Sequence, residues 1–392
     1  MPSRHRFHSV LFAASFCLSL ASGIENYALI FYVRDLFGVD KTAVGLISAG
    51  LDLFYFVGIL AFLAWKKPHP RFVAWFAAWA MAFCIAVYLL IPDWTVTFVF
   101  HCLFGLAMAL FWPRIMGWLS WGVEGKDLGR TMGRFNFSWA FGGILAPFLG
   151  GLLVEVEPRL PFVTAIGLLI LTGLLMPLGS RIFPSFKERQ ASLVVSEAEP
   201  EVAGHSGPSN LRYPARLGIA GAYFLMGVLL FIFPAWAKES LGFSESLSGS
   251  FLLVRLAVAT VGFSLWGRWT FWHFRFWPLI VSMGILLVLI ALFPAGSQPW
   301  HYYLLFAAVG LVFSFLYSYA LFHGVAGSKN RERSTTLHEA VLNVGLFSGT
   351  ALGGWVSQTW SMTAAFGMVG LTLIAVLGLQ ILLFRSRIEK KL

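Results

Sequence analysis

The chain has 392 residues, of which 58% are apolar, 17% are aromatic and only 12% are charged. Soluble domains carry about 25% charged residues, so this composition excludes an ordinary soluble protein and predicts an all-α polytopic membrane protein. A formal net charge of +10 would suggest a nucleic-acid partner in a soluble chain. In a membrane protein, however, Lys and Arg gather in the cytoplasmic loops, so we expect membrane lipid and no nucleic acid among the partners.

The first apolar run, 8–33, contains an acid and an amide, Glu25 and Asn26. The run is longer than the apolar part of a signal peptide and long enough to cross a bilayer, which takes about 20 residues. A charged group that faces lipid costs about 2.5 kcal/mol or more, so we expect Glu25 to face a cavity or a partner.

A carboxylate holds its proton more tightly in a dry site than in water, so a change of access can couple proton movement to a conformational change. Glu25 is therefore a candidate for proton coupling or substrate binding, and Asn26 is a candidate for substrate binding. The alternatives for Glu25 are a structural hydrogen bond or ion pair, or a position close to the membrane interface.

Apolar windows of about 20 residues predict twelve membrane spans. They lie near 8–33, 42–65, 72–91, 95–121, 130–154, 160–183, 215–237, 247–267, 276–294, 300–325, 334–358 and 361–384. One long break, rich in Glu and Pro, separates the sixth span from the seventh. We therefore predict a six-helix bundle over 1–183, a cytoplasmic linker over 184–215 and a second six-helix bundle over 216–392.

The distribution of Lys and Arg predicts the orientation of these spans. With the N-terminus in the cytoplasm, 21 of the 28 basic residues fall on the cytoplasmic side, 4 on the other side and 3 within spans. Such a bias places both termini in the cytoplasm. It also explains the basic balance of the chain. We expect a multi-pass protein of the plasma (inner) membrane.

Several residues recur in the second half of the chain at a nearly constant offset. Gly38, Gly45 and Trp65 recur 204 positions later as Gly242, Gly249 and Trp269, and Arg130 and Gly142 recur 203 positions later as Arg333 and Gly345. The matches keep register through the second and eighth spans and through the fifth and eleventh. They predict two pseudo-symmetric, parallel six-helix bundles.

Small residues recur four positions apart in the fifth and eleventh spans. They are Gly142, Ala146 and Gly150 in the fifth, and Gly345, Gly349 and Gly353 in the eleventh. This spacing lets helix backbones approach closely within lipid. One interpretation is simple helix packing; the other is a pair of smooth surfaces on which the two halves move.

The chain resembles the major facilitator superfamily of transporters over nearly its whole length. The segment GILAPFLGGLL, 143–153, is similar to the fifth-span motif of many exporters in that family and includes Pro147, Gly150 and Gly151. HCLFG, 101–105, stands where proton-coupled members often have Arg, three residues and Gly, and here begins with His101. The resemblance implies alternating access around a central cavity lined by the first, fourth, seventh and tenth spans.

An acid and a base lie at nearly the same depth in equivalent spans, Asp52 in the second and Arg255 in the eighth. If both point inward, they would pair across the two halves and separate when the cavity opens. The alternative is that each has a partner within its own half. Asp52 is a candidate for proton coupling, and Arg255 for substrate binding or gating.

The fourth span carries three further candidates for substrate binding, His101, Trp112 and Arg114. The first two are eleven residues apart and share a helix face, whereas Arg114 lies about 200° round from Trp112. Pro113 could kink the helix between them. Arg114 is a candidate anion-binding residue, and its alternative role is that of a structural partner.

Polar and aromatic residues of the second half complete the candidate site. In the eleventh span His338 and Glu339 suit a proton relay, and with Asn343 they suit an inner-gate hydrogen-bond cluster equally well. The seventh and tenth spans offer candidates for stacking on a substrate: Tyr223, Tyr317, Tyr319 and His323. Taken together, these aromatic residues favour an organic solute over a bare ion.

No phosphate-binding loop, metal cluster or catalytic Ser/His/Asp set is evident, so we expect neither an enzyme nor a cofactor or metal. The three cysteines, Cys17, Cys84 and Cys102, fall in apolar runs and are interpreted as core residues. The favoured hypothesis is a proton-coupled secondary transporter that moves a small organic solute by alternating access, with export of amphipathic compounds slightly favoured. The alternatives are a proton-coupled importer of an anionic metabolite or sugar-type solute, and a non-transporting sensor or scaffold with the same fold.

Overall fold

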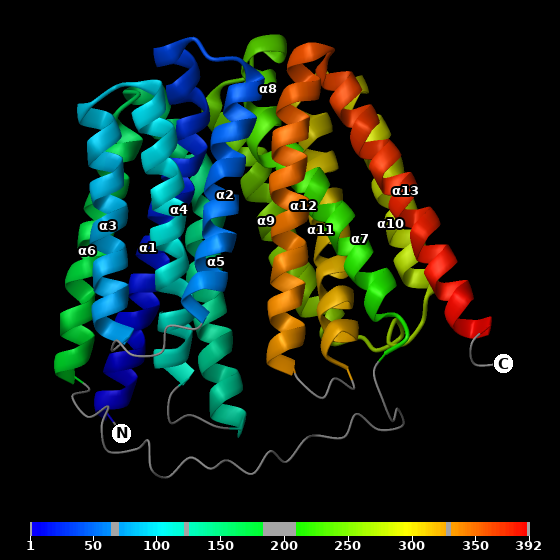
Figure 1. Cartoon of the computed structure of the whole chain (residues 1–392), viewed down its shortest axis with the longest axis horizontal. Coiled ribbons are helices and arrows are strands. Elements are labelled where there is room, and N and C mark those ends of the chain that lie inside the picture. Colours follow the sequence, from blue (N-terminus) through cyan, green and yellow to red (C-terminus); the bar gives the residue numbers. More distant parts are fainter. Residues whose placement is uncertain (1, 64–69, 121–124, 183–208, 327–330, 390–392) are drawn as a thin grey trace. The chain divides into compact units, whose positions relative to one another are not determined.

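The computed structural model describes residues 2–63, 70–120, 125–182, 209–326 and 331–389 (Figure 1). All regular elements within these ranges are helices. Twelve of the resulting segments are long and apolar enough to cross a membrane. The prediction of an all-helical polytopic membrane protein with twelve spans is confirmed. The predicted linker, 184–215, lies outside the described residues up to position 208.

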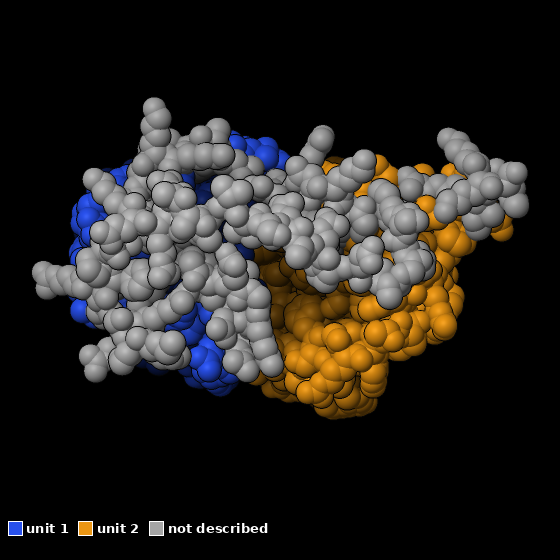
Figure 2. Space-filling model, turned by 90° about the horizontal axis from the view of Figure 1, so that it is seen from below, with its two compact units in different colours: residues 1–37, 50–200 blue, residues 38–49, 201–392 orange. Residues whose placement is uncertain are grey.

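Contacts divide the chain into two compact units, which Figure 2 shows in different colours. Unit 1 comprises residues 1–37 and 50–200, and unit 2 comprises residues 38–49 and 201–392. The division differs from the predicted bundles in one respect, because residues 38–49 group with unit 2.

In unit 1 one helix is surrounded by the others. The helices are α1 (Pro2–Phe37), α3 (Pro70–Leu90), α4 (Trp94–Ser120), α5 (Gly125–Val156), α6 (Leu160–Ile182) and most of α2 (Lys41–Leu63). α1 packs mainly against α5 and α6, while α3 packs against α4 and α6. Seven consecutive residues of α1, from Tyr27 to Val33, are buried. A helix that is apolar all round is stable only when neighbours cover it on every side, which explains its central place.

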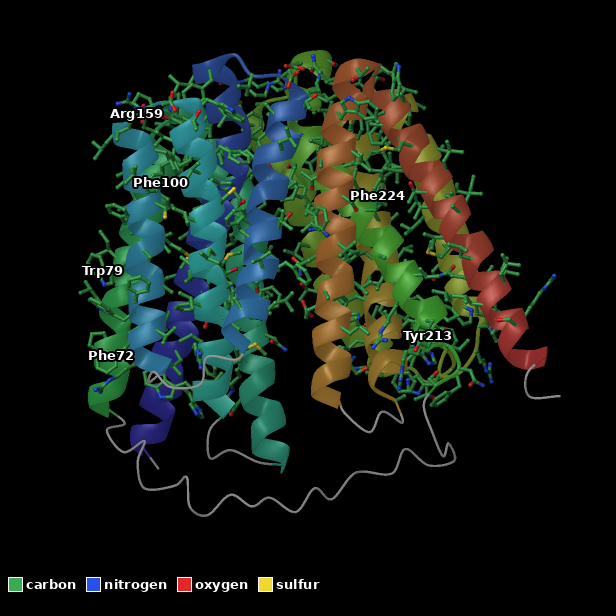
Figure 3. All side chains as sticks on the ribbon, viewed as in Figure 1. Phe72, Trp79, Phe100, Arg159, Tyr213 and Phe224 are labelled. Atoms are coloured by element: carbon green, nitrogen blue, oxygen red, sulfur yellow. The ribbon has the colours of Figure 1, made fainter. Side chains whose placement is uncertain are left out.

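The outer face of α3 carries exposed aromatic side chains. Phe72, Phe76 and Phe83 are more than half exposed, and with Trp79 they follow a spacing of three or four residues that gives one helix face. Figure 3 labels Phe72 at the outer edge of the helices, whereas the Trp79 indole lies against Gly173 of α6. A large apolar stripe of this kind suits lipid and not water.

Unit 2 repeats this arrangement with one irregularity. Its helices are α7 (Arg212–Gly227), η1 (Val228–Ile232), α8 (Phe233–Leu241), α9 (Glu245–Trp266), α10 (Trp277–Leu292), η2 (Phe293–Ala295), α11 (Pro299–Val325), α12 (Arg331–Thr359) and α13 (Met362–Glu389). α7, η1 and α8 form one continuous span. The π-helical turn η1 precedes Pro234, whose ring would clash with the carbonyl four residues earlier in a regular helix.

The same close approaches between helices occur in both units. A Cβ atom at Gly105 of α4 would collide with the backbone carbonyl of Leu51 on α2, and one at Gly310 of α11 would collide with that of Arg255 on α9. Leu51 and Arg255 are 204 positions apart, the offset predicted from the sequence. The two units therefore share their packing contacts as well as their helix order.

The turns after the first and seventh spans also repeat. Gly38 follows α1 with φ 63° and Gly242 follows α8 with φ 67°. A left-handed residue just beyond the last helical turn is a common helix stop, and glycine adopts this conformation without strain. These two glycines therefore end equivalent helices in the same way.

The first turns of α2 belong to unit 2. Lys41 Nζ lies 2.9 Å from Glu239 Oε2 at the end of α8, and the Lys41 backbone N–H donates to Gln358 Oε1 of α12 over 3.2 Å. One turn further on, Gly45 packs directly against Gly354 of α12. An ion pair, a hydrogen bond and a glycine contact thus fix this end of α2 within unit 2.

Candidate functional site

Glu25 lies in the middle of α1, where most residues of the helix are buried. The neighbouring residues Ile24, Ala28 and Leu29 are buried, and the Glu25 side chain is 0% exposed. Burying an ionised carboxylate is costly unless hydrogen bonds or an opposite charge compensate it. The partners of this side chain therefore decide what it can do.

Two other helices of unit 1 supply these partners. The Tyr88 hydroxyl of α3 donates a hydrogen bond to Glu25 Oε1 over 2.8 Å, and His101 Nδ1 of α4 lies 3.0 Å from the same oxygen. Tyr88 and His101 are also almost completely buried. We call these three residues the Glu25 cluster.

The two oxygens of the Glu25 carboxylate differ in their surroundings. Oε1 receives both contacts, whereas Oε2 has no hydrogen-bond partner among the described residues. A carboxylate oxygen that is buried and unpaired is an open proton acceptor. The geometry thus leaves one place on Glu25 where a proton can be held without breaking either existing contact.

Aromatic rings of unit 1 pack against the cluster. Phe162 of α6 lies edge-on to Tyr88 and to Tyr32, with ring centroids 5.8 and 4.8 Å apart. The imidazole of His101 stacks near Phe104, one turn along α4, at 6.2 Å. Such a setting has few competing polar groups, and in a medium of low dielectric constant the interaction between the carboxylate and the imidazole is strengthened.

Unit 2 has apolar side chains at the corresponding places. At offsets of 204 or 205 positions, the counterparts are Leu229 for Glu25, Phe293 for Tyr88 and Phe306 for His101. All three counterparts are fully buried. The packing of the bundle therefore does not itself require a polar cluster at this position.

Ring contacts support this correspondence independently of the numbering. Tyr88 lies 5.8 Å from Phe162 in unit 1, and Phe293 lies 5.3 Å from Phe366 in unit 2. The two phenylalanines, Phe162 and Phe366, are themselves 204 positions apart. The tyrosine of the cluster and its apolar counterpart therefore occupy the same place in the repeat.

Asp52 is a second buried acid of unit 1. It lies on α2, is 6% exposed, and its Oδ2 has no hydrogen-bond partner among the described residues. No contact joins it to the Glu25 cluster in the part of the chain that the structure describes. Asp52 belongs to unit 1 and Arg255 to unit 2, so their pairing across the halves stays a prediction.

Arg255 is buried on α9 among apolar and aromatic neighbours. Its Nη1 lies 3.4 Å from Met226 Sδ, and its Cζ lies 5.8 Å from the ring centroid of Phe313. The ring of Tyr223 lies 5.2 Å from that of Phe313. The structure thus brings two predicted residues, Arg255 and Tyr223, to the same aromatic cluster.

The two residues of the predicted relay are adjacent on α12 and differ in their exposure. His338 is buried and its ring lies 5.2 Å from that of Tyr317, whereas Glu339 is exposed. Successive helical residues point about 100° apart, which explains the difference. The Asn343 amide donates to the backbone carbonyl of Glu339 over 2.9 Å and not to its carboxylate.

Two aromatic candidates of α11 hold other parts of unit 2 in place. The Tyr319 hydroxyl donates to the backbone carbonyl of Arg275 over 2.8 Å. The ring nitrogen Nδ1 of His323 lies 2.8 Å from Ser209 Oγ, just before α7. Both side chains are fully buried. These contacts connect α11 with the loop before α10 and with the residues that precede α7.

The remaining candidates of unit 1 do not reach the Glu25 cluster. The Asn26 amide donates to the backbone carbonyl of Ser22 on its own helix. Trp112 packs against Phe135 and Trp139 of α5, at 6.1 and 6.4 Å. Arg114 is half-buried near the same end of α4.

The glycine stripes pack inside their own units. Gly142 of α5 lies against the backbone of α1 at Phe16, and Gly345 of α12 lies against the backbone of α7 at Ala220. Gly150 and Gly349 continue these two contacts one or two turns further along. Their geometry is that of helix packing.

Sequence reasoning missed Tyr88, which completes the Glu25 cluster. A tyrosine in an apolar helix causes no large burial cost, so its presence raised no expectation. The available signal was that Tyr88 is the only residue with a hydroxyl group in α3. Met226 and Phe313, which contact Arg255, were missed because apolar side chains in a span are ordinary.

Comparisons with known proteins agree with this architecture. A family model described as Major Facilitator Superfamily matches residues 11–322. A search of curated protein sequences finds no match.

In the part of the chain that the structure describes, no group of three or more potential metal ligands is found.

Three solved structures share the fold. Two are crystal structures of a bacterial homolog to the human lysosomal transporter Spinster, inward-facing and either unoccupied or occupied. Their TM-scores are 0.79 and 0.76 at 13% and 10% identity, and the alignments cover 99% and 98% of this chain and 98% and 97% of theirs. The third, a mutant of the nucleoside transporter NupG, has a TM-score of 0.75 at 12% identity, with 96% of this chain and 100% of that chain covered.

At such low identity the solved structures show the fold alone. The family match covers most of the sequence, and the twelve spans and repeated packing contacts agree with it. The chain therefore belongs to the major facilitator superfamily of secondary transporters.

Proposed function

We propose that this chain is a proton-coupled transporter of a small organic solute and that the Glu25 cluster is its proton site. One observation carries the proposal. A buried carboxylate lies 3.0 Å from a buried imidazole at a place where the repeat accommodates only apolar residues in unit 2. The bundle folds around Leu and Phe there, so the polar residues are best explained by their chemistry.

The cluster can exchange one proton with its surroundings. Glu25 and His101 share the short contact at Oε1, and Tyr88 fixes the carboxylate by donating to the same atom. A proton arriving at Oε2 would neutralise the carboxylate, and a proton leaving would restore an ionised group that only His101⁺ could balance. Because charge is expensive in a dry site, proton exchange requires a state in which water reaches the cluster.

Alternating access provides such states. A transporter that opens to one side and then to the other can bind a proton in one state and release it in the other, provided that the site is dry in between. The burial of all three cluster residues supports this requirement. The energy of the proton gradient would then be available to drive a solute uphill.

The solute is proposed to be organic, and export of an amphipathic compound is slightly favoured. The segment GILAPFLGGLL, 143–153, supports the export direction through its similarity to the motif of family exporters. The excess of Lys and Arg on one side supports cytoplasmic termini in a plasma (inner) membrane. Import of an anionic or sugar-type solute with protons is the second candidate, and the buried Arg255 favours it.

The proposal can be tested on purified protein in liposomes with an imposed pH gradient. The test solutes are ethidium, uridine and 2-naphthoate, one cation, one nucleoside and one aromatic acid. Accumulation driven by an acidic interior would indicate exchange of solute for protons, whereas accumulation driven by an acidic exterior would indicate uptake with protons. Either result supports proton coupling and decides the direction.

Two acid-to-amide variants provide the matched comparison. Glu25→Gln should abolish accumulation driven by the pH gradient and retain exchange of labelled for unlabelled solute. Asp93→Asn removes a charge from an exposed helix cap that contacts the Val96 backbone, and it should behave like the parent. If Glu25→Gln still accumulates solute in response to the gradient, the Glu25 cluster is not the proton site.

A further inference from the structure

An arginine interrupts the buried face of α9. Ser248, Leu252, Arg255, Ala259 and Gly262 are buried at intervals of three or four residues, the spacing of one helix face. Arg255 occupies the middle of this face and is only 7% exposed. An arginine near a helix end can extend its charged group to water or to lipid headgroups. Arg255 lies in the middle of the helix, so its presence has no such explanation.

The groups that contact this guanidinium do not balance its charge. Nη1 points at the thioether of Met226 over 3.4 Å, and sulfur of this kind is a weak acceptor. The Phe313 ring lies 5.8 Å from Cζ and offers a cation–π contact. Nε has no partner, and no carboxylate of unit 2 pairs with Arg255 among the described residues.

The fold does not need a charge at this place. In unit 1 the equivalent position is Leu51, which is 4% exposed. Gly105 packs on its backbone in the way that Gly310 packs on the backbone of Arg255. One bundle therefore forms this contact with leucine, and the other forms it with a buried cation that no described carboxylate of unit 2 balances. An isolated buried charge is among the most unfavourable arrangements in a protein.

The surroundings also indicate what kind of anion would fit. The rings of Tyr223 and Phe313 lie 5.2 Å apart, and that of Tyr317 lies 6.4 Å beyond Phe313. Tyr223 and Tyr317 are partly exposed, so aromatic surface is available beside the guanidinium. Met226 adds a flexible, polarisable side chain that adapts to different shapes.

We propose that Arg255 binds the acid group of the transported solute and that Tyr223, Met226 and Phe313 contact its apolar or aromatic body. The solute class is thus an amphipathic organic anion, with a carboxylate or phosphate at one end. The fork of an arginine pairs with both oxygens of such a group. This inference rests on the proposed transport function, because it names the substrate of the same protein.

Equilibrium binding to the full chain in detergent tests the inference without any need for transport. The probes are 2-naphthoate, its neutral amide 2-naphthamide, and inorganic phosphate. Calorimetry at pH 7.5 should show 2-naphthoate binding at least tenfold more tightly than 2-naphthamide. Inorganic phosphate at 10 mM should not compete, because it lacks the apolar body.

Three variants locate the binding site. Arg255→Lys keeps the charge but loses the fork, and should weaken 2-naphthoate binding at least tenfold. Arg255→Leu installs the residue that unit 1 has at Leu51, and should abolish the preference for the acid over the amide. Arg268→Leu removes a charge from an exposed arginine just beyond α9 and should bind 2-naphthoate like the parent.

Several results would overturn the inference. The first two are the absence of 2-naphthoate binding at 10 mM and equal affinities for 2-naphthoate and 2-naphthamide. The third is that inorganic phosphate competes as strongly as 2-naphthoate itself. The fourth is that Arg255→Lys binds 2-naphthoate as tightly as the parent does. The lysine variant decides the matter if Arg255→Leu does not fold.

The failure of this inference can be told apart from the failure of the proposed function. If gradient-driven accumulation of another solute depends on Glu25 and 2-naphthoate does not bind, the transport function stands and the solute class is wrong. If 2-naphthoate binds through Arg255 and no gradient drives any solute, the proton coupling is wrong.

Discussion

Replacing Glu25, Tyr88 and His101 together by Leu, Phe and Phe would give unit 1 the residues that unit 2 has at the same places. The side chains exchanged are similar in volume, and Leu229, Phe293 and Phe306 pack without any exposed area in unit 2. The triple variant therefore removes every polar atom of the Glu25 cluster and leaves no buried group unpaired. It should fold.

The single variant His101→Phe has a different effect. It removes one partner of a buried pair 3.0 Å apart and leaves Glu25 with the Tyr88 hydroxyl alone. Removing one partner of a buried hydrogen bond costs about 1 to 3 kcal/mol, whereas replacing a whole buried pair by apolar residues is often neutral or stabilising. The triple variant should therefore be more stable than the single one by about 1 to 3 kcal/mol. For a unit of this size that corresponds to about 2 to 12 °C in the unfolding midpoint.

The assay is thermal unfolding of the parent, the single variant and the triple variant in one detergent at pH 7.5 and one heating rate, since unfolding of such proteins is commonly irreversible. Liposomes containing the triple variant should show no accumulation driven by a pH gradient. A triple variant that unfolds at or below the temperature of His101→Phe would refute the reasoning, because the cluster would then be needed for packing. Retained gradient-driven accumulation would refute its role in proton coupling.

Three further predictions concern stability, each measured by the unfolding midpoint. Gly310→Ala should lower the midpoint by several degrees, because the added Cβ would collide with a backbone carbonyl of α9. The control is Gly378→Ala on α13, where the added Cβ meets open space, and it should leave the stability unchanged or raise it by up to about 1 kcal/mol. Equal midpoints of the two variants would contradict this prediction. Lys41→Gln breaks the partly exposed ion pair with Glu239 and should cost less than about 1 kcal/mol; a larger loss would show that this pair is not an ordinary surface pair. Burial lowers the pKa of His273 from its usual 6.5. Below pH 6.5 the unfolded chain therefore binds more protons than the folded chain, and stability falls as the pH drops. His273→Phe should make the unfolding midpoint less dependent on pH between 6.5 and 5, and an unchanged pH dependence would contradict this prediction.

The fold could be predicted from the sequence because the membrane imposes strong and local requirements. Each span needs a run of about 20 apolar residues, and such runs can be counted without knowing their neighbours. The repeat was visible through residues such as Gly38 and Gly242, whose left-handed conformation restricts the residue type. The π-helical turn η1 was not predicted, since the effect of Pro234 on the preceding turn depends on how the helix packs.

The candidate site could be predicted only in part. Glu25 and His101 were found separately, because ionisable groups stand out in apolar runs. Their contact joins positions 76 residues apart, and no local pattern reports which helices are neighbours. The relay expected from His338 and Glu339 stays a prediction, because the two residues are adjacent on α12 and successive side chains on a helix point in different directions.

The exceptions to the repeat are the most informative residues of this chain. Both units share helix order, helix stops and close backbone contacts, so a polar residue needed for packing would be expected in both. Instead, unit 1 alone has the Glu25 cluster and unit 2 alone has Arg255, and each counterpart is an apolar residue that is equally buried. Each exception carries a desolvation cost that its counterpart avoids. Such a polar group destabilises the fold, is not needed for packing and occurs in one unit only. It is best explained by a function that this unit alone performs. For unit 1 this function is proton exchange, and for unit 2 it is binding of the acid group of the solute.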